Sequence, residues 1–306
     1  MLSRENSFTL PSYAKINLSL RVLGRRPDGY HEIHTVFQTI TLCDRLTFAP
    51  LDEPRVELEC DAPDVPSDDS NLVVRAAKLL VERFRIDRGA RVKLDKTTPA
   101  GGGLGGGSSN AAVALLGLAW LWEIETTHGE LCALGATLGA DVPFFLTGGT
   151  ALGTGRGTEI APLEDVPRLS LIVVTPRVKI STAAAYESLN APALTKEIEP
   201  VNLLVSRAKS DFSGSPLSSL ANDFEPAIFP RHPEIERARD ALLEAGAHAA
   251  LLSGSGSSVF GVFESSAQVA RALAMLRVEA GWQTFACETL ARADYRAAFG
   301  ECAKFL

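Results

Sequence analysis

A run of glycines stands between residues 101 and 107, where six of the seven positions are glycine, and Ser108, Ser109 and Asn110 follow it directly. Glycine adopts positive φ angles and lets the backbone approach a ligand closely. The residues after the run are apolar with helical character, and a helix N-terminus presents free N–H groups with about half a positive charge. This combination predicts a loop that binds phosphate. A flexible linker is the alternative, but so apolar a helix directly after the loop argues against it.

The glycine run does not match the two best-known phosphate-loop motifs. The Walker motif requires a lysine after its last glycine, and Ser108 stands at that position. Gly101, Gly103 and Gly106 satisfy the dinucleotide pattern GxGxxG, but any glycine run produces this pattern by chance. A dinucleotide site also follows a buried strand, whereas the preceding stretch VKLDKTTP is half polar. The loop therefore indicates a phosphate ligand outside these two classes.

Two charged residues could take part in phosphoryl or acid–base chemistry. Lys15 lies between Ala14 and Ile16 in a predicted strand, where a lone lysine ordinarily faces solvent. Asn17 shares the face of Lys15, because strand residues two apart point to the same side. Asp141, in the stretch GADVPFF, has the neighbours of a helix cap or a turn residue. The pattern alone allows a structural as well as a chemical role for both charges.

Two further patterns argue against metal and hydrolase chemistry. The stretch YHEIH lacks the second histidine of HExxH, since Thr35 stands there, and His31 and His34 point to opposite faces of a strand. The stretch SGSGSS, at residues 253–258, forms a second glycine turn, but it is not GxSxG and offers no nucleophile elbow. A zinc site and a serine hydrolase are therefore disfavoured.

The elements that must position these residues are mostly strands in the first hundred residues, with more helices later. Alternating apolar residues predict strands at 13–24, 34–42, 55–60 and 90–99. Helical spacing predicts helices at 67–84, 108–122 and 129–139, and residues 140–162 are expected to form short strands and tight turns. A buried strand is predicted at 169–176, a strand–turn–strand unit at 248–264, and helices at 181–189, 199–208, 232–246 and 266–281.

The order of these elements predicts an α+β protein. Regular βαβ repetition is absent, which argues against a simple doubly wound sheet. A chain of 306 residues fits two domains. We expect the division in the turn-rich segment around residues 155–168, so that residues 1–160 and 161–306 form the two domains.

Composition and charge narrow the class of protein further. The chain is 46% hydrophobic and 22% charged, which is ordinary globular composition, and its net charge of −7 disfavours nucleic acid as a partner. The five cysteines form no CxxC pair, so a disulfide or zinc framework is not expected. Neither a signal-peptide pattern nor an apolar run of about 18 residues is present. We therefore expect a cytoplasmic protein without a membrane partner.

Four stretches together resemble the motifs of the GHMP kinase superfamily, whose members include galactokinase, homoserine kinase and mevalonate kinase. They lie at residues 12–40, 99–112, 138–160 and 251–263. The pieces AKINLSL, DGYHE and GADVPFF are similar to those members that phosphorylate a cytidine diphosphate sugar alcohol on the non-mevalonate route to isoprenoid precursors. The resemblance covers nearly the whole chain. It implies a two-domain α+β fold with mixed sheets, an ATP-binding N-terminal domain, a substrate-binding C-terminal domain and an active-site cleft between them.

The resemblance also implies roles for individual residues. Asp141 matches the catalytic base that takes the proton of the substrate hydroxyl, and Lys15 matches a lysine that stabilises the developing negative charge. ATP is the implied phosphoryl donor and Mg²⁺ its counter-ion, with the hydroxyl of Ser109 as a candidate ligand. The positions that match the ATP site are Pro99, Ala100, Gly101, Gly102, Gly103, Leu104, Gly105, Gly106, Gly107, Ser108 and Ser109, together with Asn71 and Leu72 on the adenine side.

The substrate side is implied in the same way. Tyr30 and His31 match a cytidine pocket, where an aromatic ring can stack on the base and an imidazole can hydrogen-bond its edge. The other matching positions are Asn17, Thr182, Tyr186, Gly254 and Gly256, and Tyr186 has helix core as its alternative. The rival functions are another small-molecule kinase of the superfamily, such as a homoserine kinase, and a nucleotide-binding module without catalysis. The DGYH segment argues against the first, and the presence of both Lys15 and Asp141 argues against the second.

Overall fold

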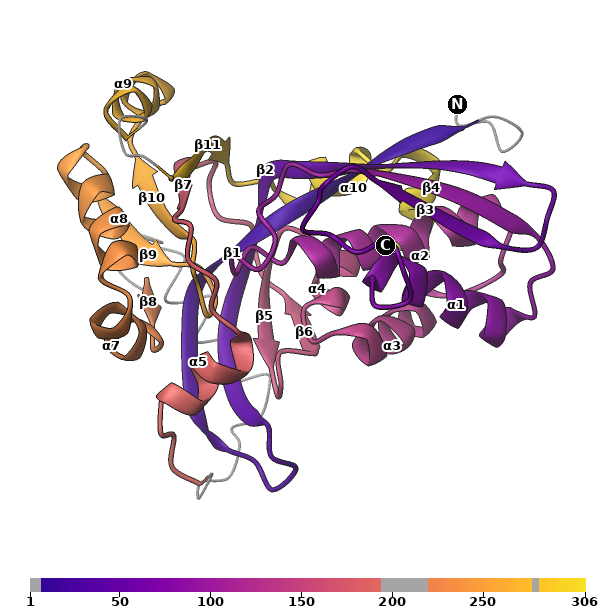
Figure 1. Ribbon diagram of the computed structural model, residues 1–306, viewed down its shortest axis with the longest axis horizontal. Coiled ribbons are helices and arrows are strands. Elements are labelled where there is room, and N and C mark those ends of the chain that lie inside the picture. Colours follow the sequence, from indigo (N-terminus) through magenta and orange to yellow (C-terminus); the bar gives the residue numbers. More distant parts are fainter. Residues whose placement is uncertain (1–6, 194–219, 277–280) are drawn as a thin grey trace.

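The computed structural model of the chain describes residues 7–193, 220–276 and 281–306. The helix expected at residues 199–208 lies outside these ranges, as does the end of the one expected at 266–281. Within the described ranges the strands form two sheets, each accompanied by helices (Figure 1). This arrangement confirms the α+β class.

The first sheet has the strand order β3-β4-β2-β1-β8, and β5 and β6 extend it through β2. Its strands are β1 (Phe8–Arg25), β2 (His31–Leu51), β3 (Val56–Cys60), β4 (Gly89–Asp95), β5 (Thr150–Thr154), β6 (Glu159–Pro162) and β8 (Ala221–Asn222). The long strands β1 and β2 pair antiparallel, whereas β3 pairs with β4 and β8 pairs with β1 in parallel. The sheet is therefore mixed, as expected.

Four helices pack beside this sheet and share one apolar core with residues of β1, β2 and β4 (Figure 1). They are α1 (Leu72–Phe84), α2 (Gly106–Leu121), α3 (His128–Leu138) and α4 (Val142–Thr147). Helix α2 is buried along most of its length, as its apolar sequence predicts.

Helix α4 is a correction to the sequence analysis, which expected strands and turns throughout residues 140–162. Strands β5 and β6 do lie there, but residues 142–147 are helical. Pro143 suits the first turn of a helix, and the rings of Phe144 and Phe145 are fully buried. A helix of six residues is too short to show a helical period in the sequence, and packing against the core decides its conformation.

The second sheet has the order β11-β7-β10-β9, and all its pairs are antiparallel. Its strands are β7 (Ser170–Thr175), β9 (Ala249–Leu252), β10 (Val259–Phe263) and β11 (Gln283–Glu288). The helices of this half are α5 (Thr182–Ser188), α7 (Glu225–Ile228), α8 (Pro233–Glu244) and α9 (Ser266–Leu276), and the 3₁₀ turn Phe229–Arg231 follows α7. In Figure 1, α8 and α9 lie on the far side of this sheet from the first one.

A second apolar core joins the two sheets and fixes the orientation of β1. Ala14, Ile16 and Leu18 belong to this core together with Val173 of β7 and Phe260 of β10. Because side chains alternate along a strand, the residues between them point to the opposite face of β1. The contact between the sheets therefore determines where Lys15 and Asn17 point.

The C-terminal residues return to the first core. Helix α10 (Arg292–Ala297) and the 3₁₀ helix Gly300–Phe305 place Tyr295, Phe299 and Phe305 in the same cluster as α2 and α4. The chain passes from the first sheet to the second between β6 and β7, near the division expected at residue 160, and β8 then returns to the first sheet. That division stays a prediction, and the last residues of the chain pack with the half that precedes it.

Two further features concern membrane-spanning helices and the state of the cysteines. In the part of the chain that the structure covers, no helix has both the length and the apolar character needed to cross a bilayer. The five cysteines all have free thiols.

Candidate active site

Lys15 and Asp141 form a charged pair in the interior of the molecule. The ammonium nitrogen Nζ of Lys15 lies 3.4 Å from Oδ2 of Asp141. The side chain of Lys15 is 4% exposed and that of Asp141 is 31% exposed, so solvent reaches the carboxylate side of the pair. The solvent-face position that the pattern allowed for Lys15 is therefore excluded. Asp141 precedes α4 at its cap position, but its side chain makes no capping hydrogen bond.

Neighbouring side chains hold Lys15 in place. Its ammonium group donates a hydrogen bond of 2.7 Å to Oδ1 of Asn17, which lies on the same face of β1 as the spacing predicts. The amide of Asn17 donates in turn to the hydroxyl of Thr35, at 2.7 Å. The ammonium group also lies 5.4 Å from the centre of the Phe37 ring, within cation–π range. These contacts give the lysine one orientation, toward Asp141.

The glycine loop runs directly past this pair and ends in α2. Gly101, Gly103 and Gly105 have positive φ angles of 72°, 76° and 69°, so glycine is needed to form the turn. The backbone N–H of Lys15 donates to the carbonyl oxygen of Leu104, at 2.9 Å. A Cβ atom on Gly105 would lie 3.0 Å from Cγ of Lys15. The N-terminus of α2 is thus placed beside the charged pair.

The second glycine turn, residues 253–258, meets the first. The backbone N–H of Ser258 donates to the carbonyl oxygen of Gly102, and the hydroxyl of Ser253 donates to that of Gly103, at 3.0 and 3.1 Å. A Cβ atom on Gly254 would lie 3.3 Å from Nζ of Lys15. The two motifs, about 150 residues apart in sequence, therefore form one site with Lys15 between them.

A buried asparagine fixes the second turn. The amide of Asn222, in β8, donates hydrogen bonds of 2.8 Å to the carbonyl oxygens of Leu252 and Gly254. Since β8 pairs with β1, this residue attaches the turn to the strand that carries Lys15. Asn222 was not predicted as a site residue, because a lone asparagine in a segment without clear periodicity gives no signal.

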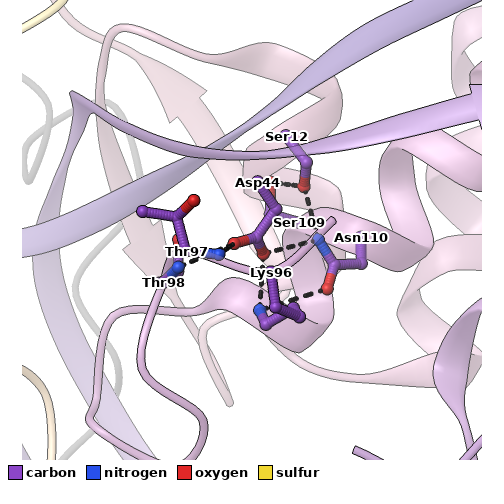
Figure 2. A network of polar contacts seen from close by, with 7 residues as sticks. All are labelled: Ser12, Asp44, Lys96, Thr97, Thr98, Ser109 and Asn110. Atoms are coloured by element: carbon purple, nitrogen blue, oxygen red, sulfur yellow. Dashed lines mark hydrogen bonds and ion pairs between the residues drawn. The ribbon is translucent and has the colours of Figure 1, made fainter. Parts of the chain in front are cut away.

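A buried polar network supports the first loop from below (Figure 2). Asp44 is fully buried, and its Oδ1 accepts hydrogen bonds from the backbone N–H groups of Thr97 and Thr98, at 2.8 and 2.7 Å. Its Oδ2 accepts from the amide of Asn110, at 2.9 Å, and from the ammonium group of Lys96. One carboxylate therefore connects the segment before the loop to the first turn of α2.

The sequence analysis also missed Asp44, although the sequence contains a signal for it. Ile40, Leu42, Leu46 and Phe48 alternate along β2 and are all buried. Asp44 falls at the same parity, where the alternation predicts an apolar core residue. A charge at such a position needs a partner, since an unpaired buried charge is very costly.

The network also determines the position of Ser109. Its hydroxyl is fully buried and accepts a hydrogen bond of 2.8 Å from the hydroxyl of Ser12. The hydroxyl of Ser12 in turn accepts from the amide of Asn110, also at 2.8 Å. Ser109 therefore helps to anchor α2, and its role as a metal ligand stays a prediction.

His31 and Tyr186 form an aromatic stack near the pair formed by Lys15 and Asp141. Their ring centres are 4.7 Å apart with an interplanar angle of 24°, and Phe224 meets Tyr186 edge-on at 4.9 Å. Burial, and the nearby charge of Asp141, raise the pKa of Tyr186 to about 12. Burial, and the charge of Arg25, lower the pKa of His31 below its ordinary value of 6.5. Tyr186 is thus part of an aromatic wall within electrostatic range of Asp141.

The structure places Tyr30 differently from His31. The Tyr30 ring is 57% exposed, on the turn that joins β1 to β2. The guanidinium carbon of Arg156 lies 4.4 Å from the centre of this ring, in the turn that joins β5 to β6. Arg156 is another residue that the sequence analysis did not single out.

Three remaining candidates have clear structural positions. Asn71 caps α1, with Oδ1 accepting from the backbone N–H of Val73 at 2.8 Å and the amide donating to the carbonyl oxygen of Pro66. Leu72 lies next to the loop, since a Cβ atom on Gly107 would be 3.8 Å from its Cδ1. Thr182 begins α5, and its hydroxyl accepts from that of Ser255 at 3.5 Å. The cap role of Asn71 is compatible with an additional ligand role.

Two models of protein families match the chain. The model of the GHMP kinases N terminal domain matches residues 71–149, and the model of the GHMP kinases C terminal domain matches residues 211–280. The first match contains the glycine loop, Asp141 and α4. The second contains Asn222 and the second glycine turn.

Individual proteins give a sharper comparison. A curated protein from Solibacter usitatus, named 4-diphosphocytidyl-2-C-methyl-D-erythritol kinase, is 42% identical over 94% of this chain and 90% of its own length. The crystal structure of a 4-(cytidine 5'-diphospho)-2C-methyl-D-erythritol kinase is 34% identical, with a TM-score of 0.75, and the alignment covers 92% of this chain and 99% of that one. A homoserine kinase from Cytophaga hutchinsonii has a TM-score of 0.68 over 95% of this chain and 96% of its own, at 19% identity, which shows a shared fold.

Proposed function

This chain belongs to the 4-diphosphocytidyl-2-C-methyl-D-erythritol kinases of the GHMP kinase family, and from that premise we propose how its residues perform the reaction. The protein is a small-molecule kinase that uses ATP to phosphorylate 4-diphosphocytidyl-2-C-methyl-D-erythritol, a step of the non-mevalonate route to isoprenoid precursors. The proposed acceptor is the tertiary 2-hydroxyl group of this substrate. The observation that carries the residue assignments is the buried Lys15 held 3.4 Å from Asp141 where the two glycine turns meet.

Asp141 is the proposed general base. Its carboxylate is accessible, makes no capping hydrogen bond and is therefore available to the substrate hydroxyl. As the oxygen of that hydroxyl bonds to the γ-phosphorus, the bond from phosphorus to the β–γ bridging oxygen breaks and the electrons leave with ADP. The hydroxyl proton passes to Asp141. Lys15 offsets the negative charge that surrounds the transferring group.

The glycine loop is the proposed phosphate site. Its positive-φ glycines and the start of α2 present backbone N–H groups, which favour an anion. The ATP residues on the adenine side, Asn71 and Leu72, lie at the start of α1 beside Gly107. The network around Asp44 joins the residues on both sides of the loop, which favours a loop formed before ATP binds.

We propose that Mg²⁺ accompanies ATP and neutralises phosphate charge. Among the described residues, no group of three or more His, Cys, Asp or Glu side chains could hold a metal ion. Mg²⁺ is commonly held mainly by the phosphate oxygens of its nucleotide and by water, with few protein ligands.

The aromatic wall is the proposed cytidine side of the site. His31 and Tyr186 offer a stacking surface, and the lowered pKa of His31 leaves the imidazole neutral at pH 7, with one donor and one acceptor for a base edge. Tyr186 lies within electrostatic range of Asp141, which is consistent with a substrate whose base and reactive hydroxyl bind at neighbouring positions. The free thiols and the use of ATP support action in the cytoplasm.

Substrate-dependent release of ADP tests the function. Purified protein with ATP and Mg²⁺ receives 4-diphosphocytidyl-2-C-methyl-D-erythritol, homoserine, mevalonate or galactose. We expect turnover with the cytidylyl substrate alone. Turnover with another acceptor would support the assignment of a kinase site and overturn the assignment of the cytidine site. ATP binding without turnover on any acceptor would favour a nucleotide-binding module.

A further inference from the structure

Glu32 is a buried carboxylate beside the proposed cytidine site that the mechanism above does not use. It follows His31 at the start of β2, and it is 1% exposed. A buried carboxylate is retained at low cost only when hydrogen-bond donors satisfy both of its oxygens. The partners of Glu32 therefore indicate what it does.

These partners come from two separate segments. One carboxylate oxygen accepts a hydrogen bond from the guanidinium group of Arg26, in the turn between β1 and β2. The other accepts from the backbone N–H of Gly155, at 3.0 Å, in the turn between β5 and β6. A backbone hydrogen bond of 2.8 Å from Ile33 to the carbonyl oxygen of Gly155 lies beside it. Glu32 thus joins two turns that are about 120 residues apart in the chain.

The same two turns carry Tyr30 and Arg156. The backbone N–H of Arg26 donates to the carbonyl oxygen of Tyr30, at 2.7 Å, and closes the first turn. Gly155 directly precedes Arg156, whose guanidinium group lies over the Tyr30 ring. Both of these side chains are exposed, and an exposed cation–π contact is weak. The contact alone is too weak to fix the turns, whereas the buried carboxylate can.

We propose that Glu32 is a positioning residue for the cytidine site. It fixes the turn that carries Tyr30, directly before His31, relative to the turn that carries Arg156. This inference rests on the proposed function. It places Glu32 in substrate recognition and outside the chemical step, because Lys15, Asp141 and the glycine loop make none of the contacts of Glu32. Loss of its charge should loosen both turns and weaken binding of the cytidylyl substrate only.

Steady-state kinetics of Glu32→Gln test this directly, since glutamine keeps the size and removes the charge. Hydrogen bonds to a charged group contribute more than neutral ones, so we expect KM for the cytidylyl substrate to rise about tenfold or more. We expect kcat, and KM for ATP, to stay within about twofold of the wild type. Glu57→Gln is the matched control, because Glu57, on β3, forms ion pairs with Arg55, just before that strand, and with Arg91 on β4, and the change should alter neither KM.

A second variant and a binding measurement separate positioning from folding. Arg26→Gln removes one partner and leaves the other, so KM for the cytidylyl substrate should rise by a smaller factor and in the same direction. Calorimetry should show weaker binding of CDP and unchanged binding of ADP in both variants.

If Glu32→Gln does not fold, the KM values and the CDP binding of Arg26→Gln test the role of Glu32. Unchanged CDP binding, or equal losses for CDP and ADP, would overturn the role of Glu32. Absence of turnover by the wild type with the cytidylyl substrate would instead overturn the proposed function.

Discussion

The ammonium group of Lys15 is almost fully buried, and burial of a charge requires compensation. Asp141 and Asn17 each contact this group, and the Phe37 ring adds a cation–π contact. Buried ion pairs often contribute little net stability. The arrangement is better explained by the chemistry of a transferring phosphoryl group, whose charge a fixed ammonium group stabilises without reorganisation.

Lys15→Met removes this charge and keeps much of the side-chain volume. Loss of one group that stabilises transition-state charge typically lowers kcat by about 10²–10³-fold, and we expect a loss of this size in ADP release. Lys93→Met is the control, since Lys93 forms an exposed ion pair with Asp95 on β4. If Lys15→Met retained the kcat of the wild type, Lys15 would have no part in the chemical step.

The lowered pKa of His31 predicts a pH dependence of substrate recognition. Burial, and then the charge of Arg25, disfavour the protonated imidazole, so His31 is neutral above its ordinary pKa of 6.5 and becomes charged only as the pH falls below that value. Since the unfolded chain binds this proton more readily, the contribution of His31 to stability is also lost on the acid side. We expect kcat/KM for the cytidylyl substrate to be level between pH 7 and 8 and to fall below pH 6.5.

His31→Asn checks this assignment. The variant should have a lower kcat/KM at neutral pH and should lack the part of the acid decline that belongs to His31. An acid decline identical in the two proteins would assign the titration to another group.

The sequence predicted the candidate site residues unequally, and the reason is physical. Asn17 lies beside Lys15 because a strand has a period of two, which is a local rule. The same period of two predicts that the side chain of Asp44 points into the core, because Asp44 occupies a core position in an alternating strand. The role of Arg156 could not be predicted from a local rule, because its contact with Tyr30 depends on two turns that only the folded sheet brings together.

At the scale of elements, the site depends on two glycine turns that fit against each other. Gly103 packs so closely that a Cβ atom would lie 2.1 Å from the carbonyl oxygen of Ser253. The positive φ of Gly103, 76°, excludes most other residues independently. The first turn was evident in the sequence from its composition. Its contact with the second turn was not, because the contact arises from the pairing of β10 with β7 and the packing of the two sheets.

Gly103→Ala should therefore damage the loop. The clash with backbone must be relieved by movement of one of the turns, and strain of this kind typically costs about 1–3 kcal/mol. We expect a lower Tm and weaker ATP binding by calorimetry. Gly129→Ala is the matched control, because Gly129 lies in α3 with no atom within 4 Å of the added Cβ. This control should leave ATP binding unchanged and Tm equal or slightly higher. Normal ATP binding by Gly103→Ala would contradict the loop assignment.

At the scale of the whole molecule, the C-terminal segment completes the core around α4, the helix that follows Asp141. Tyr295 is fully buried, and its hydroxyl donates to the carbonyl oxygen of Phe145 in α4. Its ring lies so close to Gly148 that a Cβ atom there would be 2.2 Å from it. The division near residue 160 is a prediction from turn-rich composition. The return of residues after 290 to the first core depends on tertiary contacts, which composition does not reveal.

Tyr295→Ala tests this role of the C-terminus. Truncation of a large buried ring typically costs about 3–5 kcal/mol, and urea unfolding should show a loss of this size. Met275→Ala serves as the control, because Met275 is 59% exposed in α9 and its truncation should change stability by less than about 0.5 kcal/mol. A loss for Tyr295→Ala as small as that of the control would show that the C-terminal segment does not stabilise the core.

The most direct test of the account is the single-turnover rate of Asp141→Asn with ATP, Mg²⁺ and 4-diphosphocytidyl-2-C-methyl-D-erythritol. Asparagine keeps the shape of the side chain but cannot accept the hydroxyl proton as a carboxylate does. We predict that phosphoryl transfer slows by several orders of magnitude, while calorimetry shows ATP binding unchanged within about twofold. Phosphoryl transfer at the wild-type rate would contradict the assignment of Asp141 as the base and, with it, the central claim about this site.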